Sequence, residues 1–220
     1  MKIDCSKDLL AYHFDEVTLS QDERTAMRDR RDANRKRVRD GLDEMEEPKP
    51  LEFCKQGSYA MKTMVHHPDR IYDIDDGVYF DKEELKGPNG GDKSAFDARS
   101  MVRDAVDDGS FKTEPEVRRN CVRVYYEAGY HVDIPVYRRV SEKDIFGNET
   151  VHYELAGPDW KRSDARDVTD WFDKENQRQS PDTNERETAT SDHALHKKVR
   201  VQPSKLGRKN ERLPNHQARY

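Results

Sequence analysis

The chain has 220 residues, of which 39% are charged and 33% hydrophobic, and its mean hydropathy is −1.19. This polar composition leaves apolar side chains for one small core, so we expect one mixed domain with flexible ends. A net charge of −5 at pH 7 argues against a general polyanion binder. No apolar run approaches the roughly 18 residues of a membrane span. Three scattered cysteines without a Cys-x-x-Cys pair predict neither a zinc site nor a disulfide framework, which favours a cytoplasmic location.

The first long element is a predicted helix that begins at Ser20, which stands at capping-box spacing from Glu23, and ends before Pro48. Its few apolar positions that could reach a core are Val17, Met27, Val38, Leu42 and Met45. Its basic cluster consists of Arg35, Lys36, Arg37 and Arg39. Because acidic residues are interspersed among these cations, we interpret them as a solvated helix face, and nucleic acid is not an expected partner.

Strand patterns and turn residues alternate through the middle of the chain. A short strand is predicted at 51–56, followed at Gly57 by a sharp turn into a helical segment. A second strand is predicted at 72–80. After a glycine-rich loop, apolar residues recur at helical spacing over 95–106 and predict a helix.

The last predicted elements are three strands and a helix. Strands at 121–126 and 130–139 are joined by a short Glu-Ala-Gly turn, and 150–155 is a further candidate. A helix is predicted at 163–174. Its apolar residues Val168, Trp171 and Phe172 are expected to face inward, and Trp160 is expected to pack in the core or between helices.

A change in character near residue 180 divides the chain. We assign residues 1–180 to one folded domain and residues 181–220 to a tail. The tail has few apolar residues and no sustained period, so it is predicted to be disordered.

The strand at 72–80 contains three aspartates, although aspartate is depleted in strands. Alternation places Asp73 and Asp75 on one face, where their like charges repel unless a divalent cation such as Mg²⁺ lies between them. Asp133 is a third acid within a strand. If the two strands are neighbours, the three carboxylates converge and are enough to hold two metal ions roughly 4 Å apart for an in-line phosphoryl transfer. The alternative is that all three are exposed residues on the solvated face of a sheet.

Other polar residues near these acids have separate interpretations. Gly57 and Ser58 lie on the strand-to-helix turn, where free backbone N–H groups and a hydroxyl can hold a phosphate. Phosphate cradle, paired acids and a later third acid, in that order, are the parts of a nucleotidyltransferase. Asp76 is expected to face away from Asp75 and to make strand-edge or turn hydrogen bonds. His66 and His67 lack a visible ligand set and are expected to be solvent-exposed.

The combined pattern resembles a known family. Five segments carry the resemblance: QGSYAMKT (56–63), YDIDDGVYF (72–80), CVRVYY (121–126), YHVDIPVY (130–137) and SDARDVTDWFD (163–173). Over residues 10 to 180 the chain is similar to the bacterial cyclic-GMP-AMP-synthase-like nucleotidyltransferases, the CD-NTases, of the polymerase-β-like superfamily.

The resemblance implies an α+β nucleotidyltransferase fold, with a mixed sheet flanked by helices. It implies an enzyme that joins nucleotides from ATP and GTP into a cyclic di- or oligonucleotide second messenger in antiphage defence, which a downstream effector protein senses. Asp73, Asp75 and Asp133 would bind two magnesium ions, and Asp133 would also help to activate the attacking 3′-hydroxyl. The residues implied to hold the nucleotide are Gln56, Gly57 and Ser58 at the triphosphate, and Arg123. A structural ion pair is the alternative for Arg123.

The tail departs from the family pattern, in which a helical half follows the DWF segment. Our hypothesis is that the sequence is truncated by a frameshift near residue 181; if it is, the metal site can form while base selection and cyclisation are lost. Two other functions remain open. One is a protein-modifying nucleotidyltransferase of the toxin-antitoxin type, and the other is an inactive nucleotide- or metal-binding fragment.

Overall fold

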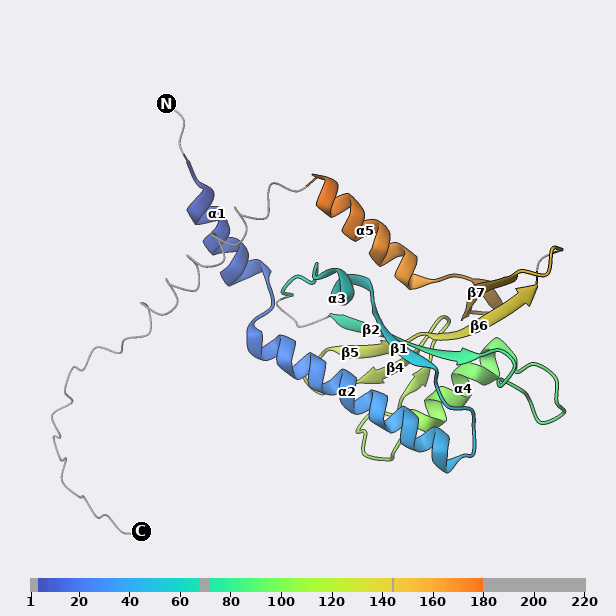
Figure 1. Cartoon of the computed structure of the whole chain (residues 1–220). Helices are drawn as coiled ribbons and strands as arrows, with labels where there is room; N and C mark the ends of the chain where they lie inside the picture. The colour runs from blue at the N-terminus through green and yellow to red at the C-terminus, as the bar shows by residue number, and fades with distance from the viewer. Residues whose placement is uncertain (1–3, 68–71, 144, 180–220) are drawn as a thin grey trace, which may run out of the picture. The chain divides into compact units, whose positions relative to one another are not determined.

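The computed structural model of the chain describes residues 4–67, 72–143 and 145–179 (Figure 1). The predicted tail at 181–220 lies outside these residues. The helical segments are α1 (Ser6–Tyr12), the π-helical turn η1 (His13–Val17), α2 (Gln21–Glu44), α3 (Gly57–Met61), α4 (Ala95–Val106) and α5 (Ala165–Gln179). Among the helices of the described residues, none has the length and apolar character needed to cross a membrane.

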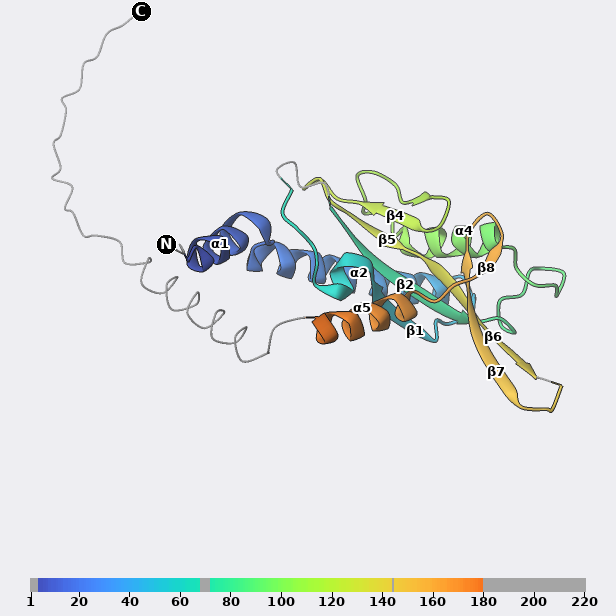
Figure 2. The same cartoon turned by 90° about the horizontal axis from the view of Figure 1, so that it is seen from above.

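The strands form one mixed, eight-stranded sheet, which confirms the predicted α+β class. They are β1 (Glu52–Gln56), β2 (Asp73–Asp81), β3 (Glu116–Val117), β4 (Val122–Tyr125), β5 (His131–Ile134), β6 (Val136–Lys143), β7 (Glu149–Ala156) and β8 (Trp160–Arg162). Their order is β3-β4-β5-β2-β6-β7-β8, with β1 paired to β2. Figure 2 shows β6 and β7 extending as a long hairpin beyond the rest of the sheet.

Strand β2 is the centre of the sheet and has three partners. It pairs with β1 in antiparallel fashion and with β5 and β6 in parallel fashion. Pro135 separates β5 from β6 because it has no N–H to donate to the ladder. The register on β2 is the same on both sides of Pro135, and the Pro135 carbonyl accepts a hydrogen bond from the Val78 N–H at 2.9 Å. The two short strands therefore act as one long neighbour of β2.

Helix α2 begins at the predicted capping box. The Ser20 hydroxyl accepts the Glu23 N–H at 3.2 Å, and the Glu23 carboxylate accepts the Ser20 N–H at 3.0 Å. Of its predicted apolar positions, Met27, Val38 and Leu42 are buried. These contacts hold α2 along the sheet in a fixed register.

The two faces of the sheet differ in character. On β2, Ile74, Val78 and Phe80 are fully buried, in a core to which α2 and α4 contribute. Asp75 and Tyr79, at the alternate positions of the strand, point to the other face. Figure 1 shows α2 and α4 on one side of the sheet and α5 on the other.

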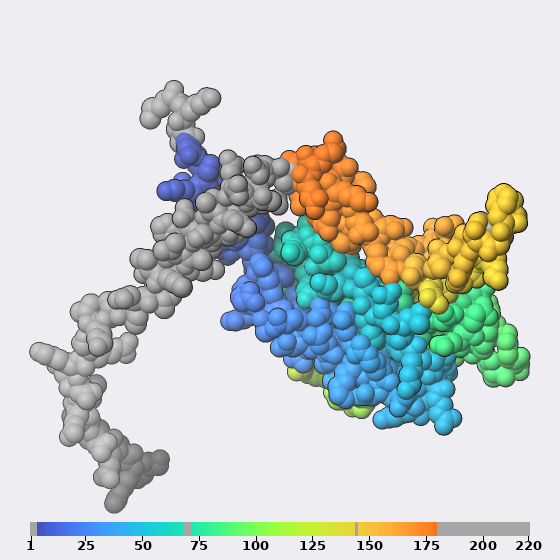
Figure 3. Space-filling view, viewed as in Figure 1, coloured from blue at the N-terminus to red at the C-terminus, as the bar shows by residue number. Residues whose placement is uncertain are grey.

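Helix α5 differs from its prediction. It forms at the expected place, but Val168 is 55% exposed, Trp171 is 62% exposed and Phe172 is only half-buried. The prediction that these three residues face a core is wrong. Helix α5 contacts the sheet near its start, where Arg166 lies over the rings of Tyr79 and Tyr153 and pairs with Glu52, and it also packs on α3. In the space-filling view α5 stands on the surface beside α3 (Figure 3). Trp160, by contrast, packs against the core as expected and donates from Nε1 to the Lys93 carbonyl at 3.0 Å.

Candidate functional site

The predicted acids are brought together by the parallel pairing of β2 with β5. The register sets Asp75 directly beside Asp133 and Asp73 beside His131. Side chains at paired positions project from the same face of a sheet, so the three carboxylates share the face that lies opposite α2 and α4. Asp73, Asp75 and Asp133 therefore share one face of two neighbouring strands, as expected. The ligand atoms that lie within 4.8 Å of one another belong to Asp73, His131 and Asp133, and this group does not include Asp75.

His131 is a member of this cluster that the motif analysis did not single out. One ligand atom each from Asp73, His131 and Asp133 lie within 4.8 Å of one another. His131 Nε2 is 3.5 Å from Asp73 Oδ2, and among the described residues it is buried without a hydrogen-bond partner. The signal was present in the sequence, because His131 stands two residues before Asp133 in a strand and so shares its face.

Asp75 lies in a buried position next to other carboxylates, which disfavours its ionised form. Burial raises its pKa to about 6, and the negative charges of Asp73 and Asp133 act in the same direction. A carboxyl group in this setting resists ionisation unless a cation is placed beside it. The site is therefore suited to bind positive charge.

Arg123 lies on β4 opposite Asp133 and pairs with it in bidentate geometry. Its Nε and Nη2 donate to the two carboxylate oxygens of Asp133, each at 2.8 Å. This hydrogen bonding raises the pKa of the guanidinium. The structure thus shows the ion pair that was the alternative for Arg123, while its contact with a nucleotide stays a prediction.

The donor set fits a divalent cation. Carboxylate oxygens are the ligands that Mg²⁺ prefers, and an imidazole nitrogen is a ligand for softer divalent ions. Three carboxylates and one guanidinium leave two negative charges in the cluster. One divalent ion neutralises this charge, so a second ion would need the additional negative charge of a bound triphosphate.

Gly57 connects the predicted phosphate turn to these acids. Its φ is +59°, and a Cβ at this position would lie 2.5 Å from Asp75 Oδ2. Glycine is required here by both the left-handed backbone and the close approach. Ser58 follows in α3 and is half-buried. The predicted phosphate-binding residues Gly57 and Ser58 therefore adjoin the acidic cluster.

Gln56 has a different environment from its neighbours. Its side chain is buried, donates from Nε2 to the Tyr79 hydroxyl and accepts from the Tyr137 hydroxyl, both at 3.1 Å. A Cβ on Gly77 would collide with this amide, so Gly77 leaves the space that Gln56 occupies. The side-chain amide of Gln56 is therefore hydrogen-bonded inside the core. A contact between Gln56 and a triphosphate stays a prediction, and it would be made by the backbone of Gln56.

Asp76 is not at a strand edge or turn, and that prediction is wrong. It is 3% exposed and accepts two hydrogen bonds from Arg35 of α2, at 2.7 Å from Nε and 2.5 Å from Nη2. The reason is that β2 lies inside the sheet, so the face opposite Asp75 is covered by α2.

The same contact corrects the solvated-face interpretation of the basic cluster on α2. Besides Arg35, Arg37 pairs with Asp108 at 2.7 Å. The Arg39 guanidinium lies over the Phe53 ring at 4.7 Å. Lys36, which pairs with Asp40, and Arg39 are exposed, as expected. His66 and His67 are exposed, as predicted.

Comparison with known proteins places this geometry in context. Residues 51–137 match the family described as cyclic GMP-AMP synthase DncV-like, nucleotidyltransferase domain. This segment contains β1, α3, β2, α4 and β5, and thus all of the predicted acidic and phosphate-turn residues. The resemblance to DncV-like nucleotidyltransferases is therefore confirmed.

Solved structures agree on the fold. The Bradyrhizobium diazoefficiens CD-NTase CdnG in complex with GTP is 19% identical, with a TM-score of 0.57 over 76% of this chain and 46% of that chain. Apo DncV of Vibrio cholerae is 20% identical, with a TM-score of 0.53 over 75% of this chain and 58% of that chain. The present chain thus matches about half of the length of these proteins.

Proposed function

We propose that this chain, whose residues 51–137 form a DncV-like nucleotidyltransferase domain, is a metal-dependent nucleotidyltransferase that acts on ATP and GTP. Its product would be a cyclic di- or oligonucleotide that serves as a second messenger in antiphage defence and is sensed by an effector protein. A cytoplasmic location is part of the proposal. The support comes from the matched domain, from the CdnG structure in complex with GTP and from a V. cholerae DncV structure described as a cyclic AMP-GMP synthase.

The observation that carries the proposal is the pairing of β2 with β5. It brings Asp75 beside Asp133 and gathers Asp73, His131 and Asp133 within ligand distance of one another. An exposed set of acids on a solvated sheet would keep ordinary proton affinities, whereas burial and the neighbouring carboxylates raise the pKa of Asp75. This favours a cation site over the solvated-face alternative.

The side chains of the cluster have distinct proposed roles. Asp73, Asp75 and Asp133 would hold two Mg²⁺ ions, which supply charge neutralisation for the phosphoryl group in transfer. The Asp133 carboxylate would also accept the proton of the attacking 3′-hydroxyl. Its bidentate pairing with Arg123 would hold the carboxylate in one orientation for this role.

The phosphate turn would position the triphosphate against these acids. Gly57 brings the chain next to Asp75, so backbone N–H groups at Gly57 and Ser58 would face phosphate oxygens that the metal ions also contact. Gln56 would contribute through its backbone, since its amide is hydrogen-bonded in the core. Arg123 would approach the nucleotide only from the edge that faces away from Asp133.

The test is incubation of the full chain with the four nucleoside triphosphates and Mg²⁺, followed by mass analysis of the products. We expect Mg²⁺-dependent consumption of ATP and GTP with formation of cyclic nucleotides. Asp75→Asn is expected to abolish this activity, because it removes a metal ligand without changing the shape of the side chain. Asp159→Asn, at an exposed position on the turn before β8, is the matched control and should retain full activity.

The two alternatives predict other products. A protein-modifying enzyme would transfer label from ATP to protein instead of releasing a cyclic nucleotide. An inactive fragment would consume neither ATP nor GTP. Activity that survives Asp75→Asn would contradict the assignment of the metal site.

A further inference from the structure

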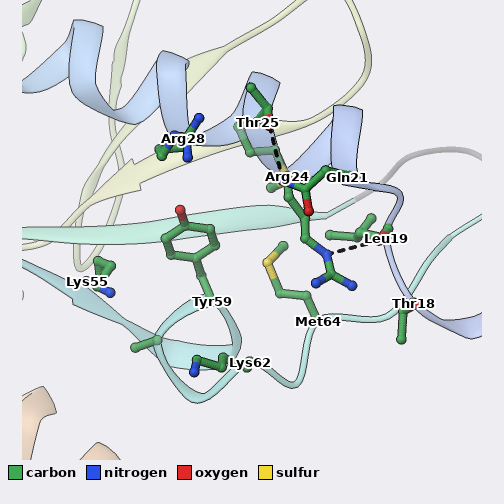
Figure 4. Close-up of a pocket in the computed structure, with 12 residues that line it drawn as sticks. Thr18, Leu19, Gln21, Arg24, Thr25, Arg28, Lys55, Tyr59, Lys62 and Met64 are labelled. Carbon is green, nitrogen blue, oxygen red and sulfur yellow. Dashed lines mark hydrogen bonds between the residues drawn. The ribbon is translucent and has the colours of Figure 1, made fainter. Parts of the chain in front are cut away.

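A second candidate site lies between α2 and α3, on the face of β1 and β2 that is opposite the acidic cluster. A hollow of about 310 Å³ is lined by Thr18, Leu19, Gln21, Arg24, Thr25, Met27, Arg28, Lys55, Tyr59, Ala60, Lys62 and Met64. Figure 4 shows Arg24, Arg28, Lys55 and Lys62 arranged around Tyr59 and Met64. This size is at the lower end of the range of small-molecule sites in proteins.

The charge of this hollow is opposite to that of the whole chain. Four of its lining residues are cations and none is an acid, while the chain carries a net charge of −5. The Arg24 Nε donates to the Leu19 carbonyl at 3.0 Å. Within the described part of the chain, the one ion pair of Arg28 is with the neighbouring Asp29, at 3.6 Å. Among the ion pairs of the described residues, none includes Lys55 or Lys62. The cations therefore repel one another, and an anion bound among them would relieve that repulsion.

The floor of the hollow is apolar and partly aromatic. Leu19 and Met27 are buried, and Tyr59 and Met64 are half-buried against the core. The Arg31 guanidinium lies over the Tyr59 ring at 5.6 Å and donates to its hydroxyl at 3.3 Å. A ring held in this way, beside two flexible thioethers, can pack against a flat ligand.

Lys62 has an uncommon backbone for its residue type. It ends α3 with φ 59° and ψ 31°, the left-handed conformation in which glycine is the usual residue. Any side chain other than glycine costs roughly 1 kcal/mol in this conformation. The chain nevertheless has a lysine here, and its side chain lines the hollow.

The hollow is distinct from the acidic cluster. Lys55 pairs with Asp76 in the β1–β2 register, so it shares the face of the sheet that α2 covers. Asp73 and Asp75 project from the other face. Helix α3 borders both sites, because Gly57 contacts Asp75 while Tyr59 and Lys62 line the hollow.

We propose that this hollow is a second ligand site, which binds a small phosphate ester with a flat ring. The phosphates bind to Arg24, Arg28, Lys55 and Lys62, and the ring packs on Tyr59 and Met64. The proposal does not rest on catalysis at the acidic cluster, because binding here needs no metal ion.

The test is isothermal titration of the full chain with ATP, and separately with inorganic tripolyphosphate, in the presence of EDTA. Without metal the carboxylates of the acidic cluster repel a triphosphate, so the hollow is the site that is measured. We expect ATP to bind more tightly than tripolyphosphate, because the ring adds contacts with Tyr59 and Met64. Equal affinity for the two probes, or no binding of either, would overturn the proposal.

Three variants locate the binding. Arg28→Gln combined with Lys62→Gln, both at exposed positions, is expected to weaken ATP binding at least tenfold. Lys112→Gln combined with Lys161→Gln removes the same charge from exposed positions elsewhere and should leave the affinity within twofold. Asp75→Asn should also retain binding. Loss of binding in the second double variant would indicate non-specific attraction, and a changed affinity in Asp75→Asn would place the ligand at the acidic cluster; either result contradicts the proposal.

Discussion

Two neighbouring aspartates on β2 have opposite environments. Asp76 is 3% exposed and has its charge matched by Arg35, whereas Asp75 faces two other carboxylates and has a pKa raised to about 6. One residue of displacement along a strand changes the face, and with it the partners. The face toward α2 uses a carboxylate to stabilise the fold. The face away from it accumulates negative charge that a bound cation can neutralise.

Asp76→Asn is expected to cause the largest loss of stability among these variants. It leaves the Arg35 guanidinium with a neutral partner in a mostly buried position, so we expect the free energy of unfolding to fall by about 2 to 3 kcal/mol. Urea denaturation measures the change. Asp40→Asn is the control, because Asp40 lies on α2 like Arg35 but forms an exposed ion pair with Lys36. Its loss should lower the free energy of unfolding by no more than about 0.5 kcal/mol. Equal losses in the two variants would contradict the special role of the buried pair.

Gln56→Met tests the buried hydrogen bonds that Gln56 makes on the face of the sheet that carries Asp75. The change keeps the volume but leaves the hydroxyls of Tyr79 and Tyr137 without their common partner, and we expect a loss of about 2 kcal/mol. Thermal unfolding measures it. If the amide instead binds triphosphate, the variant would raise the KM for ATP while its stability stayed unchanged.

Gly57→Ala tests the contact between the phosphate turn and the acids. The left-handed φ alone costs about 1 kcal/mol for alanine, and the new Cβ displaces the Asp75 carboxylate. We expect weaker Mg²⁺ binding in titration calorimetry together with this loss of stability. Gly90→Ala is the matched control, since Gly90 also has a positive φ of +77° but has open space around it. It should show the strain alone, with unchanged Mg²⁺ affinity.

Asp75→Asn is expected to change the stability of the metal-free protein in the direction opposite to that of Asp76→Asn. In the metal-free protein the folded state raises the pKa of Asp75 from 3.8 to about 6, so the folded chain binds a proton more readily than the unfolded chain. This contribution to stability is complete below pH 4 and is lost as the pH rises to about 6.

Removal of the charge should therefore stabilise the metal-free protein at pH 7, by no more than about 3 kcal/mol for a shift of roughly two pKa units. Thermal unfolding in EDTA at pH 5 and at pH 7 measures the difference between the wild type and the variant. A variant that is less stable than the wild type at pH 7 would contradict the raised pKa of Asp75 in the folded protein.

Much of the fold follows from local patterns in the sequence. Ser20 and Glu23 define the start of α2 because a capping box is a local hydrogen-bonded unit. The long strands and α4 follow from the spacing of apolar residues. Short elements such as β3 and β8 were not predicted, because two or three residues carry no period and are fixed only by pairing with β4 and β7.

The sequence by itself determined that Asp73 and Asp75 share a face, and that His131 and Asp133 share a face, since alternation along a strand is a local property. The tertiary structure decided which face is covered and by what. Only the packing of α2 gives Asp76 its partner Arg35, and only the β2–β5 register brings His131 and Asp133 beside Asp73 and Asp75. These contacts join residues far apart in the chain, so they depend on the assembled sheet and on no local pattern.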